Sequence, residues 1–586
     1  MQEDPNKVTY FAATNSRGAN TPFGIKRRDR ARHMYVIGKT GMGKSTLLEN
    51  MAIQDIRNGE GMAFIDPHGS TADRLLEYVP EHRLKDVVYF APFDMDFPVA
   101  FNVMEDVGYD KRHLVVSGLI TAFKKLWVDA FSARMEYILS NTLLALLEYP
   151  GATMLDVNRM LVNKNYRKKV VDNIKDPIVK DFWNGEFANY SDRYTQEATP
   201  AIQNKVGQFT SNPLIRNIIG QAKSSFDIRK LMDERKILII NLSKGRVGEV
   251  NAALLGSMLV TKIYLAAMSR ADVPMAVLNN LPNFYFYVDE FQNFANESFA
   301  DILSEARKYK LNLLIAHQYV EQMEEEVRDA VFGNVGTTVA FRVGPFDAEV
   351  LETVFAPQFT AQDLVNLGFA QVYMTLMIDG VGSPPFSATT LAPFDPPPKS
   401  FVEETIQSSR TQFGRARAEV ERVIQEIQDQ NPLQAEAAKP KKPAASAAGM
   451  TSTVGESAPR KAAAPAAAPR APEERIEKRE EKKERPFASP KPPREHAPRQ
   501  ERAPHTPPLE GTNSLREALS QVTGGKPQSG LKEILHTVAP KAEAPQKQTE
   551  SLPSAAGLPK EELEHMLAVD ENAKKVDDNE DWRRDR

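Results

Sequence analysis

The chain has 586 residues, with 26% charged residues, no cysteine and a formal net charge of −4. This length exceeds one ordinary domain, and the lack of cysteine excludes disulfides and thiolate metal sites, which suits a reducing cytosol. The small net charge gives no overall attraction to a polyanion, so any contact with nucleic acid must be local.

The N-terminal segment, Met1–Pro5, lacks the charged and apolar regions of a signal peptide. No run in the chain approaches about 18 uninterrupted apolar residues, so we expect no membrane-spanning helix. Two basic clusters, Lys26–Arg32 and Arg167–Lys169, have the charge that phosphate contacts need. For each cluster singly, a solvated surface is the better interpretation. No base-reading motif is present, so any DNA contact is expected to be independent of sequence.

A phosphate-binding loop is the clearest motif. Residues 38–45 fit the pattern G-x-x-x-x-G-K-[ST], after the apolar run Met34–Ile37 and before a predicted helix start. Backbone N–H groups of such a loop surround phosphate oxygens, the lysine neutralises β/γ charge and the hydroxyl ligates Mg²⁺. The pattern therefore predicts binding of ATP with Mg²⁺. The predicted nucleotide-binding residues are Gly38, Lys39, Thr40, Gly41, Met42, Gly43, Lys44, Ser45 and Thr46.

A helical segment separates this loop from the next motif. Residues 110–225 show apolar residues at helical spacing, as in Tyr137–Leu147, and Pro150-Gly151 interrupts them. A buried strand is predicted to follow at 236–242. We expect a helical insertion here, for which a structural lid is the plain interpretation.

Two carboxylates follow the aromatic and β-branched strand Phe284–Val288. In P-loop ATPases the first acid, here Asp289, holds the Mg²⁺ shell. The second, Glu290, orients and deprotonates the attacking water. Paired with a complete phosphate loop, this acid pair predicts ATP hydrolysis.

A helix over 298–310 and a strand over 311–316 are predicted next, and the strand ends in His317-Gln318. Gln318, at the tip of the strand beside the acid strand, is a candidate γ-phosphate sensor. A solvated strand end is the alternative. Arg307 lies on the polar side of the preceding helix, where a surface charge is the ordinary interpretation.

The C-terminal third changes character. Residues 401–430 show apolar residues seven apart and predict one long amphipathic helix, for packing or for a partner. Half of the forty prolines lie at or beyond Pro432, so we predict a disordered tail. Short apolar islands at 514–519, 530–535 and 560–567 are either docking segments or neutral sequence.

These motifs together resemble the additional-strand P-loop motors of the HerA–FtsK group, and most of all the TraG/TraD-type coupling ATPases of type IV secretion. Further pieces support the resemblance over about residues 20–395. They are the acid-Pro-basic-Gly turn Asp66–Gly69, the Phe-Asn element Val99–Asn102, the Glu305–Tyr309 segment before Gln318, and the late strand region 332–344.

The resemblance implies that Arg307 is an arginine finger, which acts in the ATP site of a neighbouring subunit. It also implies a homo-hexameric ring with DNA in its pore. The helical insertion and the tail would contact secretion-channel or relaxase-type proteins. The implied localisation is cytoplasmic, or peripheral at the inner face of the cell membrane.

The predicted fold class is α/β: a RecA-like additional-strand P-loop ATPase core with an all-helical insertion domain and a disordered tail. The predicted segments are the N-terminal segment (1–20), the first part of the core (21–109), the insertion (110–225), the second part of the core (226–395), the amphipathic helix (401–430) and the tail (431–586).

Three functions remain open from the sequence. The first is a ring motor that couples ATP hydrolysis to DNA or protein–DNA transfer in type IV secretion or conjugation. The second is a cytosolic HerA-like translocase in DNA processing or packaging, and the third is a nucleotide-gated scaffold. Stimulation of ATP hydrolysis by DNA separates a motor from a scaffold.

Overall fold

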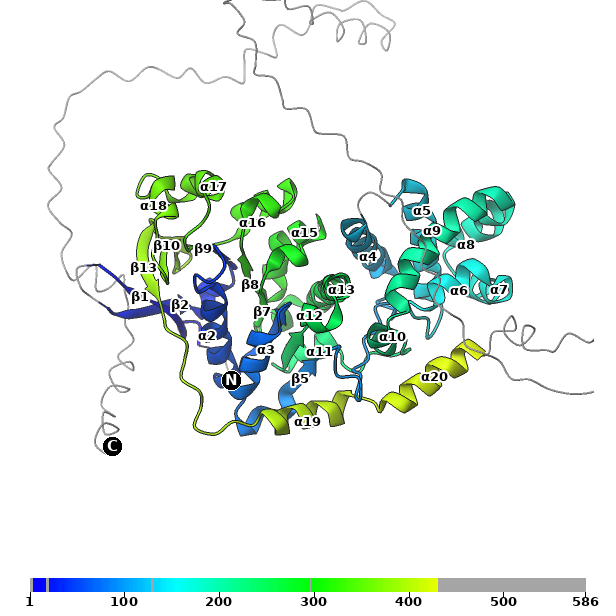
Figure 1. Ribbon diagram of the computed structural model, residues 1–586, viewed down its shortest axis with the longest axis horizontal. Helices are drawn as coiled ribbons and strands as arrows, with labels where there is room; N and C mark the ends of the chain where they lie inside the picture. The colour runs from blue at the N-terminus through cyan, green and yellow to red at the C-terminus, as the bar shows by residue number, and fades with distance from the viewer. Residues whose placement is uncertain (1–3, 17–19, 128–130, 296, 430–586) are drawn as a thin grey trace, which may run out of the picture. The chain divides into compact units, whose positions relative to one another are not determined.

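The computed structural model describes residues 4–16, 20–127, 131–295 and 297–429. These residues form an α/β body, as the sequence predicted (Figure 1). The predicted tail and its three apolar islands lie outside the described residues.

The main sheet has eleven strands in the order β2-β1-β13-β10-β9-β3-β8-β7-β4-β6-β5, and β11 and β12 form a separate pair. The strands are β1 (Val8–Thr14), β2 (Pro22–Lys26), β3 (Met34–Ile37), β4 (Gly61–Asp66), β5 (Val87–Phe90), β6 (Ile237–Asn241), β7 (Phe284–Val288), β8 (Leu311–His317), β9 (Thr337–Ala340), β10 (Gln371–Thr375), β11 (Met377–Ile378), β12 (Val381–Gly382) and β13 (Phe386–Thr390).

Seven neighbouring strands, β9 to β5, run parallel, and β2, β1, β13 and β10 continue the sheet in antiparallel pairing. Strand β8 lies between the phosphate-loop strand β3 and the acid strand β7. This inserted strand is the feature that the predicted fold class required. Because the strands are parallel, the loops after β3, β7 and β8 all leave the same edge of the sheet.

Helices cover both faces of the sheet. They are α1 (Arg27–Arg30), α2 (Lys44–Arg57), α3 (Ser70–Glu77), α11 (Ile228–Asp233), α12 (Lys244–Val247), α13 (Glu249–Met268), α14 (Met275–Leu278), α15 (Glu297–Glu305), α16 (Glu325–Asn334), α17 (Pro345–Phe355) and α18 (Ala361–Val365). Successive residues of β7 belong to different hydrophobic clusters. Phe286 is in the cluster that includes residues of α13, α15 and α16, and Tyr287 is in the cluster that includes residues of α2 and α3. Both faces of the sheet are therefore shielded from water, which explains why the sequences of its parallel strands are continuously apolar.

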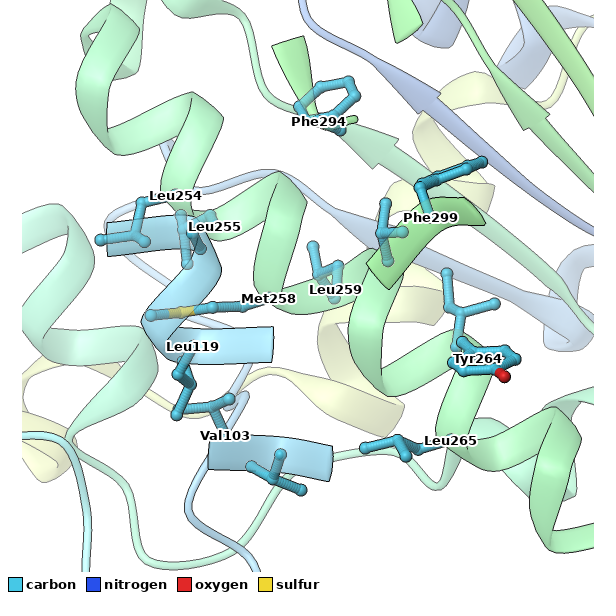
Figure 2. Packing of buried hydrophobic residues seen from close by; sticks show 14 of the residues in the cluster. Val103, Leu119, Leu254, Leu255, Met258, Leu259, Tyr264, Leu265, Phe294 and Phe299 are labelled. Carbon is cyan, nitrogen blue, oxygen red and sulfur yellow. The ribbon is translucent and has the colours of Figure 1, made fainter. Parts of the chain in front are cut away.

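Helix α13 is apolar all round because it is packed on several sides. Figure 2 shows Leu255, Met258 and Leu259 of this helix among side chains that include Leu119, Phe294 and Phe299. The stretch Glu249–Asp272 is long and apolar enough to cross a membrane, yet 67% of its most apolar window is buried inside the protein. A core helix of this kind has the same composition as a spanning one.

Within the described residues, the segment between β5 and β6 contains helices and no strand. The α-helices of this segment before α11 are α4 (Arg112–Leu126), α5 (Ala133–Glu148), α6 (Asp156–Val162), α7 (Lys164–Asn173), α8 (Pro177–Asp181), α9 (Asp192–Thr210) and α10 (Pro213–Ile219). Short turns join them at Tyr109–Lys111 (η2), Phe182–Glu186 (η4, a π-turn) and Phe187–Asn189 (η5).

The Phe-Asn element lies where this helical segment joins the core. Asn102 is buried, and its amide donates to the carbonyls of Ala152 and Ala222, at 2.9 Å each. Its side-chain oxygen accepts from the N–H of Met104 at 3.0 Å. One side chain thus fixes the chain at three separate points, which explains a buried asparagine at this position.

The prediction of a single helix over 401–430 is wrong. Two helices form, α19 (Val402–Phe413) and α20 (Arg417–Asp429), with Gly414 extended between them. Gly414 makes an isolated β-bridge with Val99, and a Cβ on Gly414 would lie 2.8 Å from the Arg410 carbonyl oxygen. Tertiary pairing therefore overrides the helical periodicity. We call α19 and α20, residues 402–429, the strap, because α19 packs on β5 and α20 on α10.

Candidate nucleotide-binding site

The phosphate loop, residues 38–45, connects β3 to α2 and is held from behind by two neighbouring strands. Its N–H groups at Gly38 and Lys39 donate to the carbonyls of His317 and Arg342, at 3.2 and 2.8 Å. A Cβ on Gly38 would lie 2.5 Å from the Cβ of Phe341, so only glycine fits there. Gly41 and Gly43 adopt φ values of 77° and 114°, which favour glycine.

The interior of this loop fits a phosphate group. Gly43 is the N-cap of the fourteen-residue helix α2 and offers no side-chain acceptor to the first N–H groups of the helix. The Lys44 ammonium is buried and donates to the carbonyls of Gly38 and Lys39, at 2.7 and 3.3 Å. Burial lowers the pKa of Lys44, and the charges of Glu290 and Asp289 oppose that change.

The predicted magnesium ligands lie side by side. The Ser45 hydroxyl donates to Oδ2 of Asp289 at 2.8 Å, across 244 residues of chain. Burial raises the pKa of Asp289 to about 6, the like charges of Glu290 and Asp66 add to the rise, and the Ser45 hydrogen bond opposes it. A hydroxyl and a carboxylate at this edge of the sheet are the oxygen donors that Mg²⁺ takes beside nucleotide phosphates. The donor set therefore fits magnesium.

The second acid is bound to the predicted sensor. The Gln318 amide donates to Oε1 of Glu290, and the Gln318 oxygen accepts from the Thr40 hydroxyl at 2.9 Å. Gln292 donates to the other carboxylate oxygen, Oε2, at 2.6 Å. The structure thus joins the phosphate loop, the acid strand and the sensor strand in one hydrogen-bonded network.

Glu290 has an uncommon backbone conformation, with φ 48° and ψ 51°, in the left-handed region. A non-glycine residue there costs free energy, so surrounding contacts must maintain it. Its N–H donates to Oδ1 of Asp289 at 2.9 Å, and its carbonyl accepts from the Asn293 amide at 3.0 Å. This turn aims the carboxylate toward Gln318 instead of continuing the strand.

The remaining loop residues have mixed surroundings. Met42 packs into the hydrophobic cluster beneath α2, Lys39 and Thr46 are half-buried, and Gly41 is exposed. Among the described residues, none of these side chains hydrogen-bonds to Asp289 or Glu290.

Arg307 is not part of this network. It lies exposed in the turn η8 (Ala306–Tyr309), directly before β8 begins, whereas Gln318 directly follows the end of β8. Seven strand residues at about 3.3 Å each place it about 20 Å from Gln318, at the opposite edge of the sheet. Arg307 therefore cannot act on the phosphate of its own subunit's site.

Sequence reasoning missed Gln292 and did not separate structural from functional polar residues. An amide two residues after the acid pair was the available signal for Gln292. Asp66, in the acid-Pro-basic-Gly turn, accepts from the N–H groups of His68 and Thr71 at 2.8 Å each, so it orders the start of α3. His317 is buried, and burial lowers its pKa to about 3.

Several residues of the two basic clusters are engaged within the protein, whereas Arg32, Lys168 and Lys169 are exposed. Arg27 and Arg30 are buried and pair with Glu60 and Asp55. Lys26 and Arg28 both pair with Asp379. In the second cluster, Arg167 donates to the carbonyls of Met160 and Leu161 at 3.0 Å each. The arginines at these positions thus stabilise the fold, and the charge available to DNA is less than the sequence suggested.

A glycine-rich loop, an acid strand separated from it by one inserted strand, and a polar sensor on that inserted strand define a P-loop nucleoside triphosphatase of the additional-strand group. Residues 19–355 match the family of type IV secretion-system coupling protein DNA-binding domains. The chain belongs to this family, which confirms the resemblance to TraG/TraD-type coupling ATPases in the HerA–FtsK group.

Solved structures with similar folds include the plasmid coupling protein TrwB in complex with a non-hydrolysable GTP analogue. It is 15% identical, with 68% of this chain and 92% of that chain covered and a TM-score of 0.49. TrwB in complex with ADP and Mg²⁺ is 15% identical, covers 67% and 91%, and has a TM-score of 0.47. VirB4 of Thermoanaerobacter pseudethanolicus is 12% identical, covers 67% and 98%, and has a TM-score of 0.46. No curated protein matches the chain.

Proposed function

We propose that this protein is the ATP-hydrolysing ring motor that moves DNA, or a protein–DNA complex, into a type IV secretion or conjugation channel. The network that joins Thr40, Gln318 and Glu290 is the observation that carries the proposal. These contacts support the proposal because they bring Glu290 and Gln318 together with the phosphate loop. Membership of the coupling-protein family favours this function over that of a cytosolic HerA-like translocase.

In the proposed reaction, the loop N–H groups and Lys44 bind the triphosphate, and Ser45 and Asp289 hold the metal. Magnesium, when bound, neutralises charge on the transferring phosphoryl group. Glu290 accepts the proton of the attacking water, and Gln318 orients that water or the γ-phosphate. The Gln318 amide is well placed for this role because it already bonds to the Glu290 carboxylate.

Arg307 supports a proposal about assembly. An exposed arginine at the far edge of the sheet cannot reach its own site, but a neighbouring copy in a ring can present it to the next one. We therefore propose a homo-hexamer in which Arg307 completes the site of the adjacent subunit. The helical insertion and the tail are proposed to bind the relaxase-type or channel partners, at the cytoplasmic face of the membrane.

Glu290→Gln tests the chemistry. We expect kcat for ATP to fall by about 100-fold or more, the range for loss of a general base, while a labelled ATP analogue still binds. Thr40→Val removes the hydroxyl that bonds to Gln318 but keeps the Glu290 carboxylate. We expect it to lower kcat by a smaller factor than Glu290→Gln. Unchanged turnover in Glu290→Gln would show that another group is the base.

Mixed rings test the arginine. Arg307→Ala subunits keep their base and Glu290→Gln subunits keep their arginine, so a mixture contains some complete sites if Arg307 acts between subunits. We expect the mixture to hydrolyse ATP faster than either variant alone. Lys308→Ala is the matched control, since Lys308 is exposed and, among the described residues, its ion pair is with Glu305 at the end of α15. No gain at any mixing ratio would argue against a trans arginine.

A further inference from the structure

Lysine 125 lies near the end of α4, the first helix of the helical insertion, and reaches into the core. Its ammonium donates to the carbonyl of Gln292 at 2.6 Å and to the carbonyl of Ala295. Both carbonyls belong to the turn that follows Glu290, which contains η7 (Phe291–Asn293). A residue of the insertion therefore holds the backbone of the proposed catalytic turn.

This contact is well suited to fixing the turn. An ammonium has three donors and no acceptor, so it can bridge the two carbonyls of this turn. The side chain is half-buried, and burial lowers the pKa of Lys125 to about 8, with the charge of Glu324 opposing. At neutral pH the Lys125 amine is therefore protonated in most molecules of the protein. Loss of the Lys125 ammonium would remove a hydrogen-bond donor from the carbonyls of Gln292 and Ala295.

The same turn is held on its other side by α13. Phe294 lies against Gly256 of that helix so closely that a Cβ on Gly256 would be 2.2 Å from the Phe294 ring. Figure 2 shows Phe294 and Leu119 of α4 around α13. The turn is thus fixed between a core helix and Lys125. The Lys125 contact comes from the insertion.

The turn that Lys125 contacts also holds the Glu290 carboxylate. Gln292, whose carbonyl accepts from Lys125, donates its side-chain amide to Oε2 of Glu290 at 2.6 Å. Two hydrogen bonds through one residue, Gln292, connect the Lys125 ammonium to the Glu290 carboxylate. A shift of Lys125 would therefore move Gln292, and with it the base.

Helix α4 is also bound to the rest of the insertion. Trp127 stacks on Phe123 with ring centroids 5.3 Å apart, and the ammonium of Lys205 from α9 lies 5.4 Å from the Trp127 ring. Helix α4 further contacts α5, α13 and α15. A displacement of the insertion that carries α4 would thus be transmitted to Lys125.

We propose that Lys125 is a positioning residue that holds the Glu290 turn in its hydrolysis-competent form and makes the rate of hydrolysis depend on the position of the helical insertion. This inference rests on the proposed ATPase function. It gives the insertion a regulatory role at the ATP site in addition to any recognition role.

The test compares Lys125→Met with Lys124→Met in the full-length protein. Lys124 is the matched control, because it is exposed and pairs with Glu136 within the insertion at 2.8 Å. The measurements are kcat and KM for ATP with and without DNA, and the affinity for a labelled non-hydrolysable ATP analogue. We expect Lys125→Met to lower kcat about ten-fold or more and to reduce stimulation by DNA, with KM and analogue affinity within about two-fold of wild type. Lys124→Met should behave as wild type.

A combined variant distinguishes positioning from general damage. If Lys125 acts through Glu290, adding Lys125→Met to Glu290→Gln should cause almost no further loss of kcat, because the base is already absent. Losses that multiply would overturn the proposal, and so would wild-type kcat in Lys125→Met.

If Lys125→Met does not bind the analogue, Lys125→Gln decides, since its shorter amide keeps a donor for one carbonyl. Normal analogue binding with a lowered kcat supports the proposal, and wild-type kcat overturns it. A wild-type protein that does not hydrolyse ATP at all would refute the proposed function itself, a result that is distinct from any difference between these variants.

Discussion

The buried ion pair between Arg30 and Asp55 yields the most direct prediction about the stability of the core. The guanidinium donates to both carboxylate oxygens, at 2.7 and 2.8 Å, and to the Tyr287 hydroxyl at 2.9 Å. It also lies 3.5 Å from the centroid of the Tyr285 ring. The side chains of Arg30 and Asp55 are 3% and 1% exposed, respectively. The pair thus joins α1, the phosphate-loop helix α2 and the acid strand β7.

Arg30→Met is expected to destabilise the protein strongly. Removing one partner leaves the Asp55 carboxylate uncompensated in a dry environment, which costs about 3–5 kcal/mol. The lost cation–π contact with Tyr285 adds to this cost. Adding Asp55→Asn removes the buried charge and keeps an oxygen that accepts from Tyr287. We therefore expect the double variant to be more stable than Arg30→Met by about 2 kcal/mol or more.

Denaturant unfolding at 25 °C measures these differences. Circular dichroism reports the helices, and binding of a labelled ATP analogue reports the site. Coincidence of the two transitions justifies a single unfolding free energy. The reasoning is refuted if Arg30→Met costs less than about 1 kcal/mol, or if the two substitutions simply add, since both results would mean that the pair is not coupled.

Three further predictions concern single positions. Burial lowers the pKa of His33 to about 4. The contribution of neutral His33 to the free energy of unfolding is therefore fully present above pH 6.5. It is lost as the pH falls toward 4, because the unfolded chain binds the proton first. His33→Asn, which tolerates the same left-handed backbone (φ 61°), should remove about 3 kcal/mol of that pH dependence in urea unfolding between pH 4 and 7, and an unchanged profile would contradict it. Arg410→Met removes the bidentate pair with Asp94, at 2.8 and 3.0 Å, in the strap; we expect a loss of about 1 kcal/mol that shrinks at high salt, and a salt-independent loss would point to packing instead. Gly38→Ala should lower affinity for an ATP analogue about ten-fold or more, because the new methyl group would meet Phe341, and normal affinity in fluorescence titration would show that the loop adapts.

Much of the core could be predicted from sequence because its signals are local. The phosphate loop, the acid pair and the strand that ends at Gln318 each combine an apolar run with polar residues at a defined end. Short β-branched and aromatic runs that end in such residues favour buried strands of a covered parallel sheet, so the residue types already indicate the fold class. The local pattern also indicated which end of each strand carries the chemistry.

Other features depended on contacts between residues far apart in the chain. Whether Gln318 or a water meets Glu290, and whether Arg27 and Arg30 face solvent or carboxylates, depends on which segments become neighbours. The break at Gly414 is of the same kind, since Val99 provides the pairing that stops the helix. Sequence periodicity contains no information about such distant partners.

The amino-acid sequence by itself predicted a P-loop core with a magnesium site, because that chemistry needs particular residues at short, regular spacing. Only the tertiary structure decided that Arg307 lies across the sheet from its own site and that Lys125 holds the Glu290 turn. The physical reason is that hydrogen bonds and burial act between atoms that are close in space, and chain spacing sets that closeness only within single elements.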